Sequence, residues 1–249
     1  MTSQTTWNCP TEKSQLSFDR VHIWRGIMPR QPYSPLTEHL SDHEIQAGGR
    51  FLSEKDKNRF LFSHGMLRAV LAYYTGNDPR SINFIQNPFG KPALEQLRHE
   101  GFNNELRFNM AHSNDIVVVA VTCRNEVGID VEYMRDIEDG EMIVTHHFSL
   151  EEQRYLHNLS PLEFRKRFFT CWTLKEAFIK ALGKGLSYPL DTFSVIDCVN
   201  QKNDTVRLQE PSDEEWYQTT FALHPSYKAA VVLQNLKPIL DLYDFNLAM

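Results

Sequence analysis

The sequence lacks any hydrophobic run long enough to cross a lipid bilayer. Its longest uninterrupted apolar run, Ile116–Val121, is far short of the roughly 20 residues that a membrane-spanning helix needs. The first residues, Met1–Ser17, are polar throughout and have no apolar core of the kind that secretory signals carry. These absences predict a cytoplasmic protein without a membrane partner.

The chain is also poor in cysteine and carries no excess of basic charge. Its four cysteines lie far apart and form no CxxC pair: Cys9, Cys123, Cys171 and Cys198. We interpret them as packing residues, because neither a disulfide framework nor a structural zinc site has this spacing. With 26 Lys and Arg against 32 Asp and Glu, the net charge of −6 gives no electrostatic reason to expect nucleic acid as a partner.

The length and composition, 249 residues with 41% hydrophobic and 23% charged residues, are typical of one or two small globular domains. In the first half, Ser41–Glu44 has the pattern of a capping box and predicts a short helix. A long amphipathic helix is expected between the N-cap candidate Ser53 and the C-cap candidate Gly76. Alternating or apolar residues predict four strands: Val21–Trp24, Ile82–Ile85, Leu106–Met110 and Ile116–Val121.

The second half repeats this order. Ser149–Glu152 is another capping-box pattern, and Ser160 with Pro161 predicts the start of a second long helix. That helix is expected to run to about Leu182, with Gly183 at its end. Three strands are expected to follow it: Thr192–Ile196, Trp216–Leu223 and Tyr227–Leu233. This repetition, without a long flexible linker, indicates two closely packed subdomains whose interface is a natural place for a cleft.

Two carboxylates in the segment Gly128–Tyr133 are the first candidates for chemistry. Asp130 and Glu132 alternate with apolar residues, so along a strand both carboxylates point to one face. Adjacent like charges repel unless a cation lies between them, and a hard divalent cation with oxygen ligands is the usual solution. An ordinary strand with its acidic face in water is the alternative.

A second candidate pair lies in the long helix expected after Ser160. Glu176 and Lys180 are four residues apart and project from one helix face. A surface ion pair is the simplest interpretation, but the helix is otherwise apolar and leaves only a narrow polar stripe. We therefore expect Glu176 and Lys180 to face a cleft instead of bulk solvent.

The third candidate is the pair His112 and Ser113, which ends the segment Phe108–Ser113. No GxSxG elbow surrounds Ser113, which argues against a serine hydrolase. His112 could contact a phosphate group, or it could simply hydrogen-bond a loop. The residues alone leave both interpretations open.

Taken together, these segments resemble the 4′-phosphopantetheinyl transferases. Gly128–Glu132, followed by Trp172–Lys180 and Gly183–Leu186, is similar to the paired signature of that family. Asn87–Pro92 and Phe108–Ser113 are similar to two further motifs of its larger, surfactin-synthetase-activating (Sfp) type. The four motifs occur here in the order that the family has.

The resemblance implies an α+β fold that is a pseudo-dimer of two similar α/β subdomains, each a long helix packed on a small, mainly antiparallel sheet. We place the N-terminal subdomain at residues 18–125. The C-terminal subdomain, with the Mg-binding carboxylates, is placed at residues 126–249. The resemblance also implies a monomer, because the two halves of one chain build the site together.

The resemblance assigns catalytic and metal-binding roles to the candidate residues. Asp130, Glu132 and Glu176 match the three carboxylates that hold Mg²⁺, a sensible oxygen-ligand set for that ion. Glu176, directly or through a water, would take the proton of the substrate serine. Lys180 would stabilise the charge that develops on the leaving group, and His112 would add to this charge neutralisation.

Further residues are implied to bind coenzyme A (CoA). His112 and Ser113 fall on the family's CoA-contacting loop, and Lys91, after Gly90, falls on its phosphate-contacting turn. Lys180 matches a lysine placed near the pyrophosphate. The implied reaction transfers the 4′-phosphopantetheine arm from CoA to a serine of an acyl or peptidyl carrier protein, and it releases 3′,5′-ADP.

The sequence departs from the family pattern at two places. Ala111 stands where the family often has a small hydroxyl residue, so a side-chain contact to CoA is lost there or replaced by backbone N–H groups. Residues 43–49 contain no Lys or Arg, although many members carry basic residues there for the CoA 3′-phosphate. Four basic residues that follow this segment could substitute: Arg50, Lys55, Lys57 and Arg59.

Two other function classes stay open: another Mg²⁺-dependent phosphoryl or nucleotidyl transferase, and a non-catalytic module that binds carrier proteins. Fatty-acid, polyketide and nonribosomal-peptide carriers are all small, acidic and helical. An enzyme with a net charge of −6 must therefore meet them through a local apolar or basic patch. Candidates are the segment Ser149–Leu159 and the region around Phe168, for which core packing is the other interpretation.

Overall fold

The computed structural model describes residues 6–9, 15–29, 35–95, 105–200, 205–208, 214–235, 237 and 239–246. Its strands are β1 (Arg20–Ile27), β2 (Phe84–Gln86), β3 (Pro92–Leu94), β4 (Leu106–Ser113), β5 (Ile116–Cys123), β6 (Val127–Tyr133), β7 (Phe193–Ser194), β8 (Arg207–Leu208), β9 (Trp216–Thr220), β10 (Tyr227–Gln234) and β11 (Ile239–Asp244). Its α-helices are α1 (Asp42–Gly48), α2 (Glu54–Thr75), α3 (Gly140–His147), α4 (Leu150–Leu156), α5 (Pro161–Leu182) and α6 (Ile196–Val199). None of the helices within these ranges combines the length and the hydrophobicity that crossing a membrane requires.

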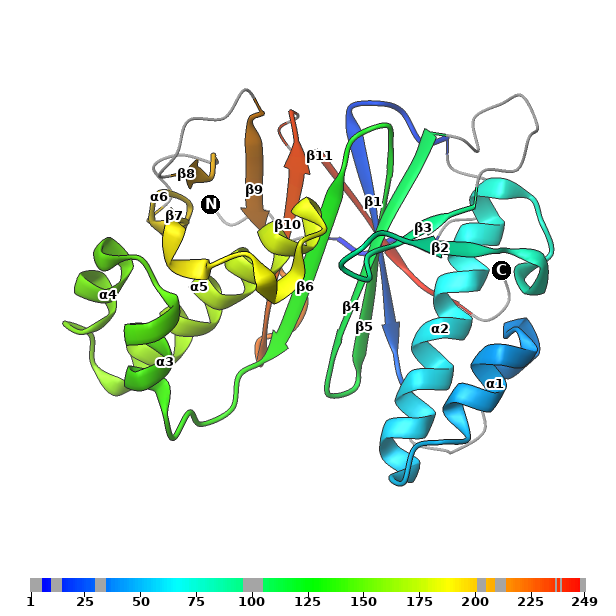
Figure 1. Ribbon diagram of the computed structural model, residues 1–249, viewed down its shortest axis with the longest axis horizontal. Coiled ribbons are helices and arrows are strands. Elements are labelled where there is room, and N and C mark those ends of the chain that lie inside the picture. Colours follow the sequence, from blue (N-terminus) through cyan, green and yellow to red (C-terminus); the bar gives the residue numbers. More distant parts are fainter. Residues whose placement is uncertain are drawn as a thin grey trace.

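Two sheets lie at the centre of the molecule, with one long helix on the outer face of each (Figure 1). The first sheet has the strand order β11-β1-β5-β4 and packs against α2, and the second has the order β6-β10-β9 and packs against α5. All neighbours are antiparallel except β1 and β11. The structure is therefore the expected α+β fold of two similar halves.

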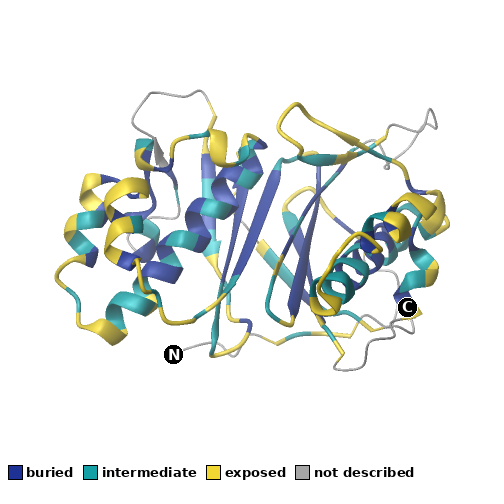
Figure 2. Cartoon of the chain, turned by 60° about the horizontal axis from the view of Figure 1, so that its bottom comes forward, coloured by how far each residue is buried: buried dark blue, intermediate teal, exposed yellow. Residues whose placement is uncertain are grey.

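The apolar run in β5 is explained by burial on both faces of its strand. Val117 and Val119 belong to the core between the first sheet and α2. Val118 and Ala120 belong instead to a second core, which lies between the two sheets. Figure 2 shows the central strands buried and the outer helix faces exposed. A strand with apolar neighbours on both sides reads as a continuous hydrophobic run, and not as an alternating one.

Both halves follow one order of elements: a strand, a short capped helix, a long helix and a hairpin. In the first half these are β1, α1, α2 and the β4–β5 hairpin, and in the second β6, α4, α5 and the β9–β10 hairpin. The sheet orders β1-β5-β4 and β6-β10-β9 correspond strand for strand. The topology therefore shows the predicted repetition. Each half also begins with a strand, β1 or β6, and the repeat expected from the sequence did not include this strand.

An ion pair from the short helix to the long helix is repeated in both halves. The capping-box carboxylate Glu44 accepts from Arg68 Nε of α2 at 2.6 Å. In the same way Glu152, in the capping box of α4, pairs with Lys175 Nζ of α5 at 2.8 Å. Both pairs are almost completely buried. Each carboxylate thus caps its own helix and anchors it to the neighbouring one.

The helix predictions are confirmed, including the long helices that end at left-handed glycines, Gly76 with φ 73° and Gly183 with φ 68°. The prediction of a strand over Thr192–Ile196 is wrong at its end, because β7 stops at Ser194 and α6 follows. The Val195 N–H donates to the Glu152 carboxylate at 2.8 Å instead of to a neighbouring strand. The other predicted strands are present with ends shifted by up to three residues.

The final strand, β11, was not predicted from the sequence pattern. It pairs in parallel with β1, from Arg20 opposite Ile239 to Arg25 opposite Asp244. A segment from the range 126–249 therefore completes the sheet of the first half. The subdomain ranges 18–125 and 126–249 remain predictions.

Gly128 allows α5 to lie directly on β6. A Cβ atom added at Gly128 would overlap the carbonyl oxygen of Ala177 and the amide nitrogen of Ala181, both in the α5 backbone. Backbone atoms in the middle of a packed helix cannot move aside as the tip of a side chain can. The helix can therefore approach the strand this closely only where the side chain is a hydrogen atom.

We expect the substitution Gly128→Ala to lower the free energy of unfolding by about 1–3 kcal/mol or more, because it forces α5 away from β6. Urea unfolding followed by circular dichroism would measure this change. Gly49→Ala is the matched control, since a Cβ there would meet its nearest atom at 3.4 Å. Equal stability of the two variants would contradict the close-packing argument.

We also expect Glu44 to make stability depend on acid pH. Burial disfavours its charge, but hydrogen bonds from His64 and Ser41 and the charge of Arg68 lower the pKa of Glu44 from 4.5 to about 2. This stabilisation is fully present above pH 4.5 and is lost as the pH falls through about 2. The free energy of unfolding of the wild type should therefore fall more steeply between these pH values than that of Glu44→Gln. Asp42→Asn, an exposed change in the same helix, should keep the wild-type slope.

Candidate active site

Strand β6 and helix α5 bring the four predicted charged residues to one place. Asp130 and Glu132 share a strand face with Gly128, and this face is the one that α5 covers. Glu176 and Lys180 lie one turn apart on α5, next to the Gly128 contact. The predicted juxtaposition of the strand carboxylates with the helix pair is therefore present in the structure.

The closest contact in the site is the ion pair of Lys180 and Asp130. Lys180 Nζ donates to Asp130 Oδ1 at 2.6 Å, while Asp130 Oδ2 is buried and has no hydrogen-bond partner among the described residues. Burial raises the pKa of Asp130 to about 7, although the charge of Lys180 opposes this rise. Burial also disfavours the charge of Lys180, but the attraction of Asp130 dominates and raises its pKa.

The other two carboxylates add negative charge to this pair. Glu176 is half-buried, and burial together with repulsion from Glu132 raises its pKa against the opposing charge of Lys180. Glu132 and Glu176 likewise add to the rise of the pKa of Asp130. Three carboxylates thus influence one another around Lys180, and the exposed Arg135 lies 3.8 Å from Glu132, so three carboxylates stand against two cations and the site has an excess of negative charge.

These residues suit a hard divalent cation by their chemistry. Carboxylate oxygens are the ligands that Mg²⁺ prefers, and the unpartnered Asp130 Oδ2 gives one buried oxygen available for such an ion. Within the described part of the chain, no group of three His, Cys, Asp or Glu side chains is already arranged as a metal-binding cluster. Binding of the ion therefore requires a side-chain adjustment around the ion pair of Asp130 with Lys180.

Strand β4 lies beside β6 and contributes the residues of the other half. Ser113 Oγ donates to Glu132 Oε2 at 3.0 Å and accepts from the Tyr133 N–H at 3.0 Å. Four residues earlier, Asn109 Oδ1 accepts from the Ile129 N–H at 2.9 Å. These side chains tie the first sheet to the edge of the second. Ser113, which was predicted to contact CoA, has partners within the protein.

Basic side chains of the first half face the carboxylates from across the site. His112 has an exposed position, and partial burial together with the positive charges of Arg59 and Lys180 lowers its pKa. His64 contributes to the same lowering. Arg59 pairs with Asp56 at 2.9 Å through one terminal nitrogen, but its Nε is buried without a hydrogen-bond partner among the described residues. Arg59 therefore offers positive charge, and His112 a ring nitrogen, to an anionic ligand.

A cavity of about 880 Å³ lies next to these basic groups in the first half. Its polar lining includes His43, His64 and Asn109, and Gly90 lies at its edge. Its apolar lining comprises Ala47, Phe60, Leu67, Ile82, Phe84, Pro92 and Met110. Polar and charged residues thus form about half of the lining, including the paired Glu44 and Arg68, and such a mixed lining suits a small molecule with both polar and apolar groups.

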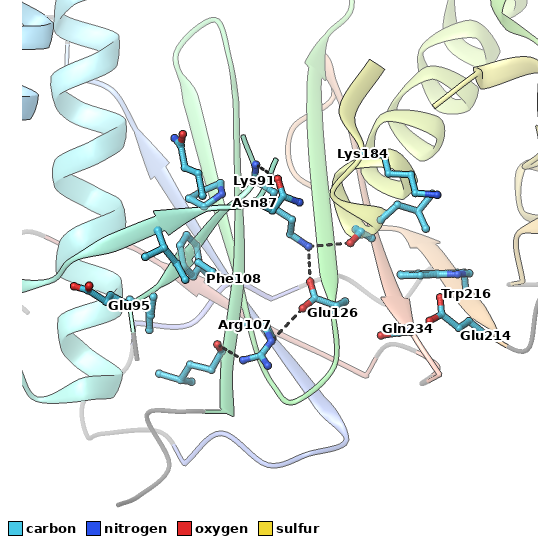
Figure 3. Close-up of a pocket in the computed structure, with 18 residues that line it drawn as sticks. Asn87, Lys91, Glu95, Arg107, Phe108, Glu126, Lys184, Glu214, Trp216 and Gln234 are labelled. Atoms are coloured by element: carbon cyan, nitrogen blue, oxygen red, sulfur yellow. Dashed lines mark hydrogen bonds and ion pairs between the residues drawn. The ribbon is translucent and has the colours of Figure 1, made fainter. Parts of the chain in front are cut away.

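Lys91 points away from this cavity, although Gly90 next to it is part of the lining. Its ammonium donates to Glu126 Oε2 at 2.6 Å and to the carbonyl oxygen of Ala181 at 2.9 Å (Figure 3). It therefore lies in a second cavity, of about 740 Å³, between the β2–β3 hairpin and the end of α5. The structure thus separates the two residues of the predicted phosphate-contacting turn.

Phe168 is 4% exposed and stacks on Trp172, with ring centroids 6.0 Å apart, so it belongs to the core and offers no docking surface. In the segment Ser149–Leu159, Leu150 is 69% exposed at the start of α4. That segment remains a candidate for carrier contact.

Three residues shape the site although the sequence pattern did not predict their roles. Gly128 occurs in a family motif, and its role in the α5–β6 contact could have been suspected, because a glycine within a strand often marks a close backbone approach. Asn109 and His64 carried no local signal, because their roles depend on β6 and on the pocket beside α1. Such contacts between distant segments become visible only in the folded chain.

Two family models match adjacent parts of the chain, one on each side of residue 125. Residues 24–124 match "4'-phosphopantetheinyl transferase, N-terminal", and residues 126–232 match the "4'-phosphopantetheinyl transferase superfamily". The second match contains β6 and α5, and the first contains β4 and the 880 Å³ cavity.

Several bacterial proteins are similar over most of the chain. The 4'-phosphopantetheinyl transferase HetI of Nostoc sp. (strain PCC 7120) is 35% identical over 187 residues, which cover 74% of this chain and 77% of HetI. Sfp of Bacillus subtilis (strain 168) is 32% identical over 193 residues, covering 77% and 81%. The gsp protein of Aneurinibacillus migulanus is 29% identical over 196 residues, covering 76% and 78%.

Proposed function

Because this chain belongs to the 4′-phosphopantetheinyl transferase superfamily, we propose that the site between β4, β6 and α5 is its catalytic centre. The protein is a 4′-phosphopantetheinyl transferase and transfers phosphopantetheine from CoA to carrier proteins. The observation that supports the site is the burial of Asp130 against Lys180, with Glu132 and Glu176 beside them. Family membership favours this reaction over the two other function classes that the sequence left open.

In this proposal, Asp130, Glu132 and Glu176 hold Mg²⁺. The free oxygen of Asp130 and the excess of negative charge support it. When bound, the ion would polarise the CoA diphosphate and neutralise charge that develops on the leaving group. Lys180 lies within hydrogen-bond distance of Asp130, so its ammonium is placed to donate to a phosphate oxygen at the same location.

The proton of the substrate serine would pass to Glu176, directly or through a water. Glu176 is half-buried on α5 beside Lys180, and a positioned carboxylate can act as a general base toward a hydroxyl. Lys180 would donate to the departing 3′,5′-ADP, and His112 would donate a hydrogen bond to a phosphate oxygen from the β4 side. Because the electrophile is a charged diphosphate, charge neutralisation contributes more than covalent catalysis.

The 880 Å³ cavity is the proposed site for the nucleotide part of CoA. Phe60 and His64, with ring centroids 4.0 Å apart, give it an aromatic wall suited to a purine. Of the four suggested basic residues, Arg59 is placed so that its charge acts on His112, and its Nε has no hydrogen-bond partner among the described residues. We therefore place the phosphate groups of CoA between Arg59, His112 and Lys180.

The carrier protein is proposed to bind at the open side of the same centre and to present its serine to Glu176. Both halves of the site come from one chain, with His112 on β4 and Glu176 on α5, which supports a monomer as the active form. The identity of the carrier, and the contact proposed at Ser149–Leu159, remain predictions.

We expect Glu176→Gln to lower kcat by on the order of 100-fold or more while the fold stays intact, because the amide can neither take the proton nor bind a metal as a carboxylate does. The assay is the phosphopantetheine mass increase of an apo carrier protein, with circular dichroism for the fold. Glu163→Gln, an exposed change on the same helix, is the matched control and should keep full activity. Activity of Glu176→Gln like that of the wild type would reject the assignment.

We also expect chelation with EDTA to abolish transfer, and added Mg²⁺ to restore it. Mg²⁺ should raise the unfolding temperature of the wild type in the absence of CoA, because a ligand of the folded state stabilises it, but not that of Asp130→Ala. Fully active enzyme after EDTA treatment would remove the metal from the mechanism.

A further inference from the structure

The β2–β3 hairpin of the first half reaches across to the end of α5 in the second half. Its turn is ordered by Asn87, whose Oδ1 accepts from the N–H groups of Phe89 and Lys91 at 2.9 Å each. The backbone adds two hydrogen bonds between Asn87 and residues 90 and 91, and Gly90 adopts a left-handed φ of 88°. The turn is therefore a defined structure that presents two side chains in one direction.

Both side chains bind the carbonyl oxygens at the end of α5. Asn87 Nδ2 donates to the Gly183 carbonyl at 2.7 Å, and Lys91 Nζ donates to the Ala181 carbonyl at 2.9 Å. The last carbonyls of a helix lack partners within the helix, and a cation is favourable there because of the helix dipole. The first half thus caps a helix of the second half.

Lys91 is held from a second side as well. Its ammonium pairs with Glu126 at 2.6 Å and lies 3.3 Å from the Val127 carbonyl, where β6 begins. Glu126 in turn accepts from Arg107 Nε of β4 at 3.1 Å (Figure 3). The Lys91 side chain is only 14% exposed. One buried lysine therefore joins the hairpin, the start of β6 and the end of α5.

We propose that Asn87 and Lys91 form a latch that fixes α5 against the first half, and that Lys91 is a positioning residue for the transfer reaction instead of a phosphate ligand. The inference rests on the proposed function, in which Lys180 and Glu176 lie on α5 and His112 lies on β4. Lys180 precedes the capped Ala181 by one residue. A small shift of the helix end would therefore displace Lys180 and Glu176 from their partners across the site.

The contacts of Lys91 favour this role over direct binding of CoA. Its ammonium has three oxygen partners in the protein, so contact with a phosphate requires the loss of a partly buried ion pair and of two hydrogen bonds to carbonyls. It also lines the 740 Å³ cavity, and is not part of the lining of the 880 Å³ cavity to which Gly90 belongs. A Cβ added at Gly183 would approach Asn87 Nδ2 at 2.8 Å, which shows how closely the turn packs on the helix end.

The test compares Lys91→Met and Asn87→Ala with Lys184→Met in the full-length protein. Lys184 is exposed at the same helix end and contacts the ring of Tyr188, so its substitution removes an equal charge without breaking the latch. The latch predicts that Lys91→Met lowers kcat about tenfold or more while KM for CoA changes less than about twofold, because misplaced catalytic groups slow the chemical step. Asn87→Ala should act in the same direction, and Lys184→Met should match the wild type.

A second readout is hydrogen exchange of the amides in the last turn of α5, which does not depend on activity. Exchange should be faster in Lys91→Met and Asn87→Ala, and unchanged in Lys184→Met. A tenfold rise in KM for CoA with unchanged kcat in Lys91→Met would overturn the latch in favour of direct phosphate contact. Unchanged kinetics would overturn it as well. A wild-type protein without transfer activity would reject the proposed function, while the exchange result would still decide whether the latch exists.

Discussion

The close contact between α5 and β6 at Gly128 is the constraint on which the rest of the structure depends. It sets the height of the helix above the strand, and therefore places Glu176 and Lys180 over the face that carries Asp130. A side chain at Gly128 would push the helix outward and separate these groups. The buried pair of Glu152 with Lys175 and the hydrogen bond from Lys91 to the Ala181 carbonyl hold the same helix from its other sides. The catalytic helix is thus fixed by backbone contact and by charge together.

The electrostatics of the site follow from this placement. Three carboxylates and one lysine share a partly buried volume, where charges interact more strongly than in water. Lys180 pairs with Asp130 at 2.6 Å and the exposed Arg135 lies 3.8 Å from Glu132, so two cations stand against three carboxylates on this side. Positive charge from Arg59 lies on the first half, near His112. An anionic substrate with its metal ion would complement both sides, and so the two halves need each other for a balanced site.

Local signals in the sequence predicted α1, α2, α4 and α5, most strands and the charged site, but not α3 or α6. The capping patterns at Ser41 and Ser149 located helix starts, and the alternation at Asp130 and Glu132 gave the correct strand face. Two errors arose from contacts between distant segments. The strand predicted over Thr192–Ile196 ends early because the Glu152 carboxylate binds the Val195 N–H. Strand β11 was missed because it forms by pairing in parallel with β1. The same holds for Lys91, whose partners lie far along the chain and have no local signature.

The pairing of β11 with β1 also has a consequence for the order in which the chain can fold as it is synthesised. Strand β1 is made long before its parallel neighbour at residues 239–244. Until then one edge of the first sheet offers unpaired backbone groups, a feature that favours association with other chains. The parallel pair also joins segments that are far apart in sequence, which slows folding. A nascent chain would therefore expose an unpaired strand edge throughout the synthesis of the residues between β1 and β11.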